Sequence, residues 1–303
     1  MDPQTRESRH PWLGVGALLA CATLWSLNGP LIKLLDQAHL PAITIACYRS
    51  LIGGLIFLPL AAPRWRSLRQ LPLRWPLFSI AAFTLMTACF VIATTMTAAA
   101  NAIILQYTSP IWVAVLAPWL LRERLGRSEL LVLAVAMVGV LVIFLGHPTR
   151  DIPALAIGLA SGLGYGALTV ALRGLRRLDA RLAVALNFLG SGLLLVPAVG
   201  LWGSFGLSGR QLWLISLLSV VQFALPYLLF SWALRHVAAG RAALIVLLET
   251  VLNPLLTWLL VGERVPTPTL IGGPIILASV ASWMVLTWQR ERKARSQQAL
   301  REN

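Results

Sequence analysis

Two charged residues, Arg49 and Glu249, lie in the middle of long apolar stretches of this 303-residue chain. A charged group at the centre of a bilayer costs roughly 2.5 kcal/mol or more, so such residues are rare and are candidates for function. Both lie too far from the ends of their stretches to reach water easily. The Glu249 carboxylate could bind a cationic group or a proton, and protonation would remove its charge during a crossing.

Each of the two charges also has a structural interpretation. In that interpretation, backbone carbonyls or hydroxyls satisfy the buried group, which then holds helices together. We assign Arg49 and Glu249 as structural or coupling charges, and Glu249 also as a binding residue. The sequence leaves open whether the two side chains pair with each other.

Uncharged polar and aromatic residues lie beside prolines in the same stretches, as in Asn28-Gly29-Pro30 and Asn253-Pro254. Proline bends a helix and frees a backbone carbonyl, which then needs a protein or water partner. Polar groups beside such breaks in both halves of a chain predict a central cavity for a small-molecule substrate. The alternative is ordinary hydrogen bonding between helices. The candidate cavity residues are Trp25, Asn28, Asn101, Gln106, Tyr107, Tyr165, Gln222, Tyr227, Glu249 and Asn253.

The remaining reactive side chains form no catalytic or metal-binding pattern. Cys21, Cys47 and Cys89 all lie in apolar stretches, which favours small buried residues over a disulfide framework. The four histidines lie far apart, and no His or Cys spacing resembles a metal site. The stretches contain no paired carboxylates and no nucleophile beside a base, so an intramembrane enzyme is the weakest hypothesis. We expect no catalytic residue, metal or cofactor.

These side chains must be carried by membrane-spanning helices. The chain is 58% hydrophobic and 12% charged, with a mean hydropathy of +0.77, which is too apolar for a soluble protein of this length. Apolar stretches of about 20 residues, long enough to cross a bilayer, recur along it. They predict an all-α membrane protein with ten transmembrane helices. The predicted spans are residues 12–35, 41–62, 73–96, 98–121, 128–145, 152–173, 182–203, 211–234, 242–261 and 269–288.

The net charge of +14 indicates orientation rather than nucleic-acid binding. With a cytoplasmic N-terminus, 20 of the 25 Lys and Arg residues fall at the cytoplasmic side and 4 at the other, while Arg49 lies within a span. The positive-inside rule predicts this asymmetry for ten helices with both ends inside. We therefore expect a multi-pass protein of the cell inner (plasma) membrane, with both termini cytoplasmic and basic loops near anionic lipid.

The two halves of the chain are related by an internal repeat. A shift of 140 residues aligns Glu123-Arg124-Leu125 with Glu263-Arg264-Val265, and it aligns Lys33 with Arg173. Five helices in each half would place the second copy upside down, so we predict two inverted five-helix repeats, an arrangement common in secondary transporters. The predicted units are a first repeat at 12–145, a second repeat at 152–288 and a cytoplasmic tail at 289–303.

Five segments together resemble the EamA-type branch of the drug/metabolite transporter superfamily. They are Trp-Ser-Leu-Asn-Gly-Pro at 25–30, Tyr-Arg at 48–49, Trp-Leu-Leu-Arg-Glu-Arg-Leu at 119–125, Leu-Glu-Thr-Val-Leu-Asn-Pro at 248–254 and Leu-Leu-Val-Gly-Glu-Arg-Val at 259–265. The chain departs from the family pattern at Arg122, where glycine is usual, and at Thr250, where proline often follows the glutamate. The resemblance implies ten helices in two inverted repeats around a substrate cavity. It also implies transport of small metabolites or drugs, with many bacterial members acting as exporters.

Our leading hypothesis is an inner-membrane transporter that exports amino-acid-like or amphiphilic solutes by alternating access. The expected partners are the solute, the lipid bilayer, and a coupling proton or counter-substrate. The alternative is a membrane scaffold or sensor without flux, which predicts a sealed apolar interior near Trp25, Tyr107 and Glu249.

Overall fold

The computed structural model describes residues 11–70, 72–120, 127–175, 178–233, 236–237, 242 and 245–302, and every regular element in these ranges is a helix. A helix bonds its own backbone groups, which a lipid environment requires. The elements are α1 (Pro11–Ser26), α2 (Asn28–Gln37), α3 (Ala42–Ala61), η1 (Ala62–Gln70), α4 (Arg74–Met96), α5 (Ala99–Gln106), α6 (Ser109–Leu120), α7 (Arg127–Gly146), η2 (Thr149–Asp151), α8 (Ile152–Gly174), α9 (Ala180–Trp202), α10 (Gly209–Leu217), η3 (Leu218–Ala224), α11 (Leu225–Ala233), α13 (Glu249–Val261) and α14 (Thr267–Glu302).

Eight helical segments in the described part of the chain are long and apolar enough to cross a bilayer. Two shorter apolar helices, Leu131–Gly146 and Glu249–Val261, fall within or beside the predicted fifth and ninth spans. The all-helical membrane fold is therefore confirmed, whereas the number of ten transmembrane helices stays a prediction. The predicted tail continues α14 as one helix to Glu302.

Three of the prolines near the candidate polar residues lie in the first turn of a helix, whereas Pro254 lies inside α13. Pro30 is the third residue of α2, Pro110 the second of α6 and Pro226 the second of α11. Proline is tolerated in the first turn of a helix, because the N–H that it lacks would have no partner there. Two predicted spans are thus interrupted by a turn, between α1 and α2 and between α5 and α6, whereas the π-helix η3 continues directly into α11.

Corresponding helices of the two halves pack on each other through reciprocal contacts. Gly54 of α3 lies against Leu189 of α9, and Gly192 of α9 lies against Leu51 of α3. The order of these contacts makes α3 and α9 antiparallel, and the missing side chains allow the helices to approach closely. The same exchange occurs between α7 and α14, where glycines 139 and 272 lie against isoleucines 276 and 143.

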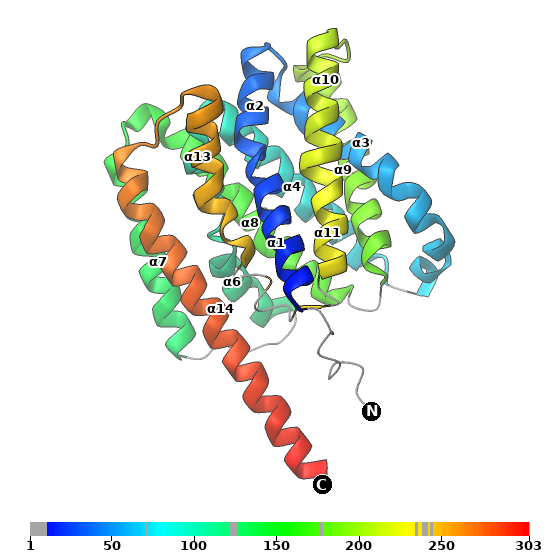
Figure 1. Ribbon diagram of the computed structural model, residues 1–303, viewed down its shortest axis with the longest axis vertical. Coiled ribbons are helices and arrows are strands. Elements are labelled where there is room, and N and C mark those ends of the chain that lie inside the picture. The colour runs from blue at the N-terminus through cyan, green and yellow to red at the C-terminus, as the bar shows by residue number, and fades with distance from the viewer. Residues whose placement is uncertain are drawn as a thin grey trace.

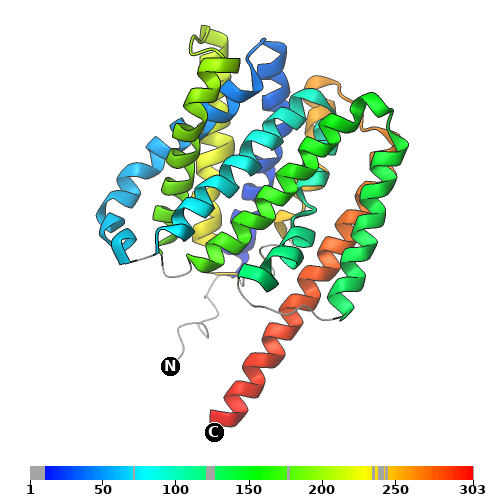
Figure 2. The same ribbon diagram turned by 180° about the vertical axis from the view of Figure 1, so that it is seen from behind.

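The helices form one bundle in which α7 and α14 lie side by side along one edge (Figure 1). α1 begins and α14 ends toward the same end of the molecule, and α2, α10 and α13 reach the opposite end (Figures 1 and 2). The elements around the polar interior that contains the candidate site are α1, α2, α3, α4, α5, α8, η3, α11 and α13.

Candidate functional site

A cavity of about 80 Å³ lies where helices of both halves meet. Its lining residues are Trp25, Asn28, Arg49, Met86, Phe90, Gln106, Tyr107, Tyr165, Gln222, Phe223, Tyr227 and Glu249. The space accommodates several water molecules or a small headgroup. It is well below the roughly 300–1,000 Å³ of sites that enclose drug-sized ligands, so a larger solute requires the helices to move apart.

Glu249 carries the negative charge of this cavity. It is the first residue of α13, it is 8% exposed, and its Oε2 accepts a hydrogen bond of 2.9 Å from Tyr107 Oη. Its backbone carbonyl accepts a hydrogen bond from Ser26 Oγ at 3.4 Å. In the described part of the chain no ion pair joins Glu249 to Arg49 or to another cation. The carboxylate is therefore held in place by a neutral donor and has no cationic partner among the described residues.

Arg49, in contrast, is held by several protein groups. Its Nη1 donates to Asn28 Oδ1 at 2.8 Å, and its Nη2 donates to Thr87 Oγ1. The guanidinium also lies over the Phe223 ring, 4.5 Å from the centroid, which is cation–π geometry. These contacts tie α3 to α2, α4 and η3. They favour the structural interpretation of Arg49, although the side chain also lines the cavity.

Aromatic rings form much of the wall around Glu249. Trp25 meets Tyr227 edge-on, with 5.3 Å between ring centroids, and Tyr107 meets Tyr165 edge-on at 6.3 Å. The faces of such rings carry partial negative charge and attract cations. A carboxylate among aromatic faces suits a solute that combines an ammonium group with an apolar body.

Two glutamines of the lining link helices across the interior. Gln106 Nε2 donates to Ser161 Oγ at 2.8 Å, and Gln222 Nε2 donates to the Trp25 carbonyl at 3.3 Å. The Gln222 Oε1 is buried and has no partner among the described residues. It is therefore an acceptor that a bound solute or water could use.

The structure brings eight of the ten sequence-derived cavity candidates into this lining and places Asn101 and Asn253 outside it. Asn101 accepts a hydrogen bond from Thr269 Oγ1 and lies 3.2 Å from His147 Nε2. Asn253 is fully buried on α13 beside Gly29. Both asparagines therefore lie in helix contacts rather than at the cavity wall.

Three lining residues, Met86, Phe90 and Phe223, are absent from the sequence-derived set. They are apolar, so neither charge nor polarity distinguishes them from the many lipid-facing residues. The spacing of Met86 and Phe90 by four residues places them on one face of α4, but only the neighbouring helices show which face that is. The described residues contain no group of three His, Cys, Asp or Glu side chains that could hold a metal ion.

The profile of the EamA-like transporter family matches the chain twice, at residues 12–145 and 152–285. The chain belongs to this family. Its cavity is thus built by both EamA repeats, since Trp25 and Tyr107 come from the first match and Tyr165 and Glu249 from the second. The resemblance seen in the sequence is confirmed, and the protein is a multi-pass membrane transporter.

Relatives of this EamA-type chain come from distant organisms. It is 30% identical to an uncharacterized transporter of Archaeoglobus fulgidus over 205 residues, which are 67% of this chain and 74% of the relative. It is 24% identical to the uncharacterized inner membrane transporter YicL of Salmonella typhimurium, covering 93% and 98% of the two chains. It is 27% identical to the uncharacterized transporter YvbV of Bacillus subtilis, covering 89% and 90%.

A crystal structure described only as that of a protein has the same fold. It aligns with a TM-score of 0.61 and 17% identity, covering 93% of this chain and 98% of the other. At that identity the similarity concerns the arrangement of helices alone.

Proposed function

We propose that this protein exports a small solute with a cationic, amino-acid-like or amphiphilic character across the cell inner membrane by alternating access. The observation that carries the proposal is the Glu249 carboxylate, which lines a cavity between the two EamA repeats and has no cationic protein partner in the described part of the chain. A buried carboxylate in this state is favourable only when a solute cation, a proton or water satisfies it.

The architecture that we propose has ten transmembrane helices in two inverted repeats, residues 12–145 and 152–288, followed by a tail at 289–303. The antiparallel, reciprocal packing of α3 on α9 and of α7 on α14 supports it, because a two-fold axis in the membrane plane produces such exchanged contacts. The excess of basic residues on the side of the termini supports a cytoplasmic location for both ends.

In this mechanism the two repeats rock about their shared contacts and open the cavity to one side at a time. Tyr107 orients the Glu249 carboxylate, and the aromatic wall receives the apolar part of the solute. A proton that replaces the solute cation on Glu249 would neutralise the charge during the return step. The protein would thus exchange a proton, or a counter-substrate, for the exported solute.

The experiment is transport by purified protein in proteoliposomes loaded with a panel of small amines, amino acids and neutral analogues of equal size. We expect flux of cationic members and its loss in Glu249→Gln. The matched control is Asp151→Asn, the same change at an ion pair that lies outside the cavity. Absence of flux for every solute would overturn the transport proposal.

The scaffold or sensor alternative predicts an apolar interior without a cavity. The described residues instead form a cavity lined by Trp25, Tyr107 and Glu249. No observation favours this alternative over transport.

A further inference from the structure

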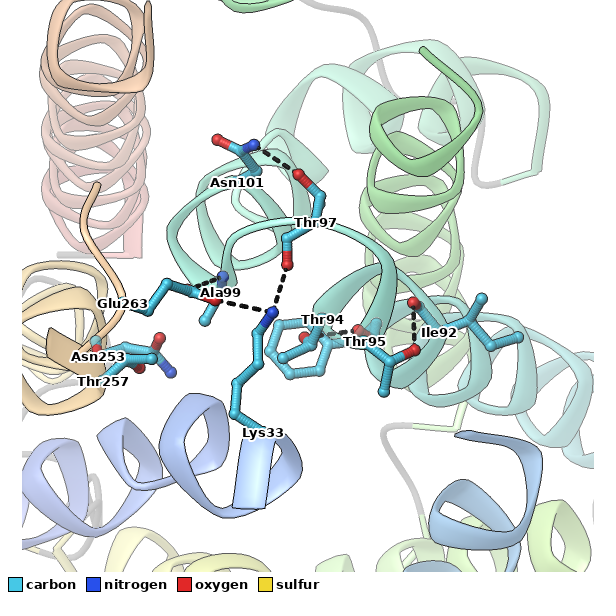
Figure 3. A network of polar contacts seen from close by, with 11 residues as sticks. Lys33, Ile92, Thr94, Thr95, Thr97, Ala99, Asn101, Asn253, Thr257 and Glu263 are labelled. Carbon is cyan, nitrogen blue, oxygen red and sulfur yellow. Dashed lines mark hydrogen bonds and ion pairs between the residues drawn. The ribbon is translucent and has the colours of Figure 1, made fainter. Parts of the chain in front are cut away.

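Three segments meet in a polar contact at the end of the molecule opposite the point where α1 begins (Figures 1 and 3). Lys33 of α2 forms an ion pair with Glu263, with 2.7 Å between Nζ and Oε2. Lys33 Nζ also donates to the Thr97 carbonyl at 2.8 Å, and Glu263 Oε1 accepts from the Ala99 backbone N–H at 2.7 Å. One pair of side chains thus joins α2, the α4–α5 linker and the segment after α13.

This contact connects the two repeats, because Lys33, Thr97 and Ala99 belong to the first family match and Glu263 to the second. The side chains of the ion pair are only 14% and 21% exposed. Partial burial reduces screening by water, so each charge depends on the other for stabilisation. The Arg150–Asp151 pair is different in kind, since it joins neighbouring residues and its arginine is 86% exposed.

A polar stripe on α13 leads from the cavity toward this ion pair. Glu249, Asn253 and Thr257 follow each other at four-residue spacing on one helix face, over about 12 Å. Asn253 and Thr257 lie against Gly29 of α2, and both are almost completely buried. The packing of α2 on α13 therefore closes the route between Glu249 and the Lys33–Glu263 pair.

Asn253 is the unusual member of the stripe. It is fully buried, and neither its Nδ2 nor its Oδ1 has a partner among the described residues. A buried amide without hydrogen bonds is costly, and a permanent wall between helices would be more stable with an apolar residue. A residue that meets water or solute when the helices separate has a reason to be polar.

We propose that the Lys33–Glu263 pair is an outer lock between the two repeats, and that Asn253 lies on the exit route that this lock closes. This inference rests on the proposed transport function. It adds the residues that close the transport route on the outer side of the membrane. Separation of α2 from α13 breaks the ion pair and the contact at Gly29, and it exposes Asn253 to the outside. Lys33 and Glu263 are thus positioning residues, since they act through the helices rather than on the solute.

The test is the accessibility of a cysteine at Asn253→Cys to a membrane-impermeant maleimide added outside intact cells. With the lock intact we expect slow labelling. Glu263→Gln should accelerate it at least tenfold, and so should Lys33→Met. The double variant Lys33→Met/Glu263→Gln leaves no unpaired charge behind, so it tests the lock even if a single variant fails to fold. The protein with Asn253 unchanged measures the background from its three natural cysteines.

The control variant is Asp151→Asn, which removes an exposed ion pair and should leave the labelling rate unchanged. Equal labelling with the lock intact and broken would overturn the proposal, as would acceleration only in inside-out vesicles. Transport without any change in the labelling rate would contradict the proposed lock but not the proposed transport function. Accelerated labelling in a protein that transports no solute would contradict the proposed transport function and support the lock, because labelling does not require transport.

Discussion

Two glutamates of the second repeat are held in opposite ways. Glu249 lines the central cavity, accepts one hydrogen bond from Tyr107 and has no cation beside it in the described part of the chain. Glu263 is paired with Lys33 and also accepts a hydrogen bond from the Ala99 backbone. The Glu249 carboxylate is therefore available to a ligand, whereas the protein's own groups already bind the Glu263 carboxylate.

The difference shows how a chemical group acquires its role from its neighbours. A carboxylate that already has a cation and a backbone donor gains little from a further ligand, and it serves best to hold segments together. A carboxylate with a single neutral donor still lacks the interactions that burial removed. Our proposals accordingly give ligand binding to Glu249 and closure of the cavity to Glu263, and the following substitutions test this division.

The largest effect is expected from Glu249→Gln on the binding of an aromatic amine such as phenethylamine. Loss of a charge-assisted contact of about 1.5–3 kcal/mol weakens binding by about 10- to 150-fold. Glu263→Gln should change the affinity of the same probe by less than about threefold, a limit of roughly 0.7 kcal/mol. Isothermal titration calorimetry in lipid nanodiscs measures both constants. Equal losses of affinity in the two variants would contradict the proposed division of roles between Glu249 and Glu263.

Arg49 tests whether the second charge of the cavity is structural. Arg49→Met leaves Asn28 and Thr87 without their buried donor and removes the contact with Phe223, so we expect a stability loss of about 2–3 kcal/mol. Arg49→Lys keeps the positive charge but lacks the planar guanidinium, so its stability should lie between those of the unaltered protein and Arg49→Met. Thermal unfolding in detergent ranks the three proteins. A melting curve of Arg49→Met that matches the unaltered protein would contradict the anchoring role.

A double-mutant cycle examines the coupling within the lock. Each single variant, Lys33→Met or Glu263→Gln, leaves a partly buried charge unpaired. The sum of the two single-variant losses of stability should therefore exceed the loss in the double variant by about 1–2 kcal/mol. The same cycle at Arg150 and Asp151 should give less than about 0.5 kcal/mol, as expected for an exposed pair. Thermal unfolding of the seven proteins, the unaltered chain and three variants from each cycle, provides the comparison. Additive effects at Lys33 and Glu263 would show that the pair is not coupled.

The smallest effect is expected from Tyr107→Phe, which removes only the hydroxyl that orients Glu249. Because this hydroxyl orients the carboxylate and does not itself bind the solute, we expect an indirect loss of about 1 kcal/mol, so the affinity for phenethylamine should fall about fivefold. Tyr165→Phe is the matched control, since Tyr165 meets the Tyr107 ring edge-on, whereas the hydrogen bond to Glu249 comes from the Tyr107 hydroxyl. A larger loss for Tyr165→Phe would place the solute nearer to α8 than we propose.

Composition and periodic repetition were sufficient to predict much of this protein. An apolar chain of this length must bury its helices in lipid. The Glu-Arg pair at 123–124, which recurs at 263–264, reflects a duplicated unit that the family matches reproduce. Charge and polarity also identified eight of the twelve lining residues by type, together with Arg49. Such groups are rare within a membrane because they are costly there, so their presence is informative.

Only the tertiary structure decided which polar groups face the cavity and which pairs form. Asn253 and Glu249 lie on the same helix and in similar sequence surroundings. Asn253 packs against Gly29 of α2, whereas Glu249 accepts a hydrogen bond from Tyr107. Lys33 and Glu263 are 230 positions apart, and no local pattern joins them. A sequence specifies which groups need partners, whereas the partners depend on how the helices of two repeats approach each other in space.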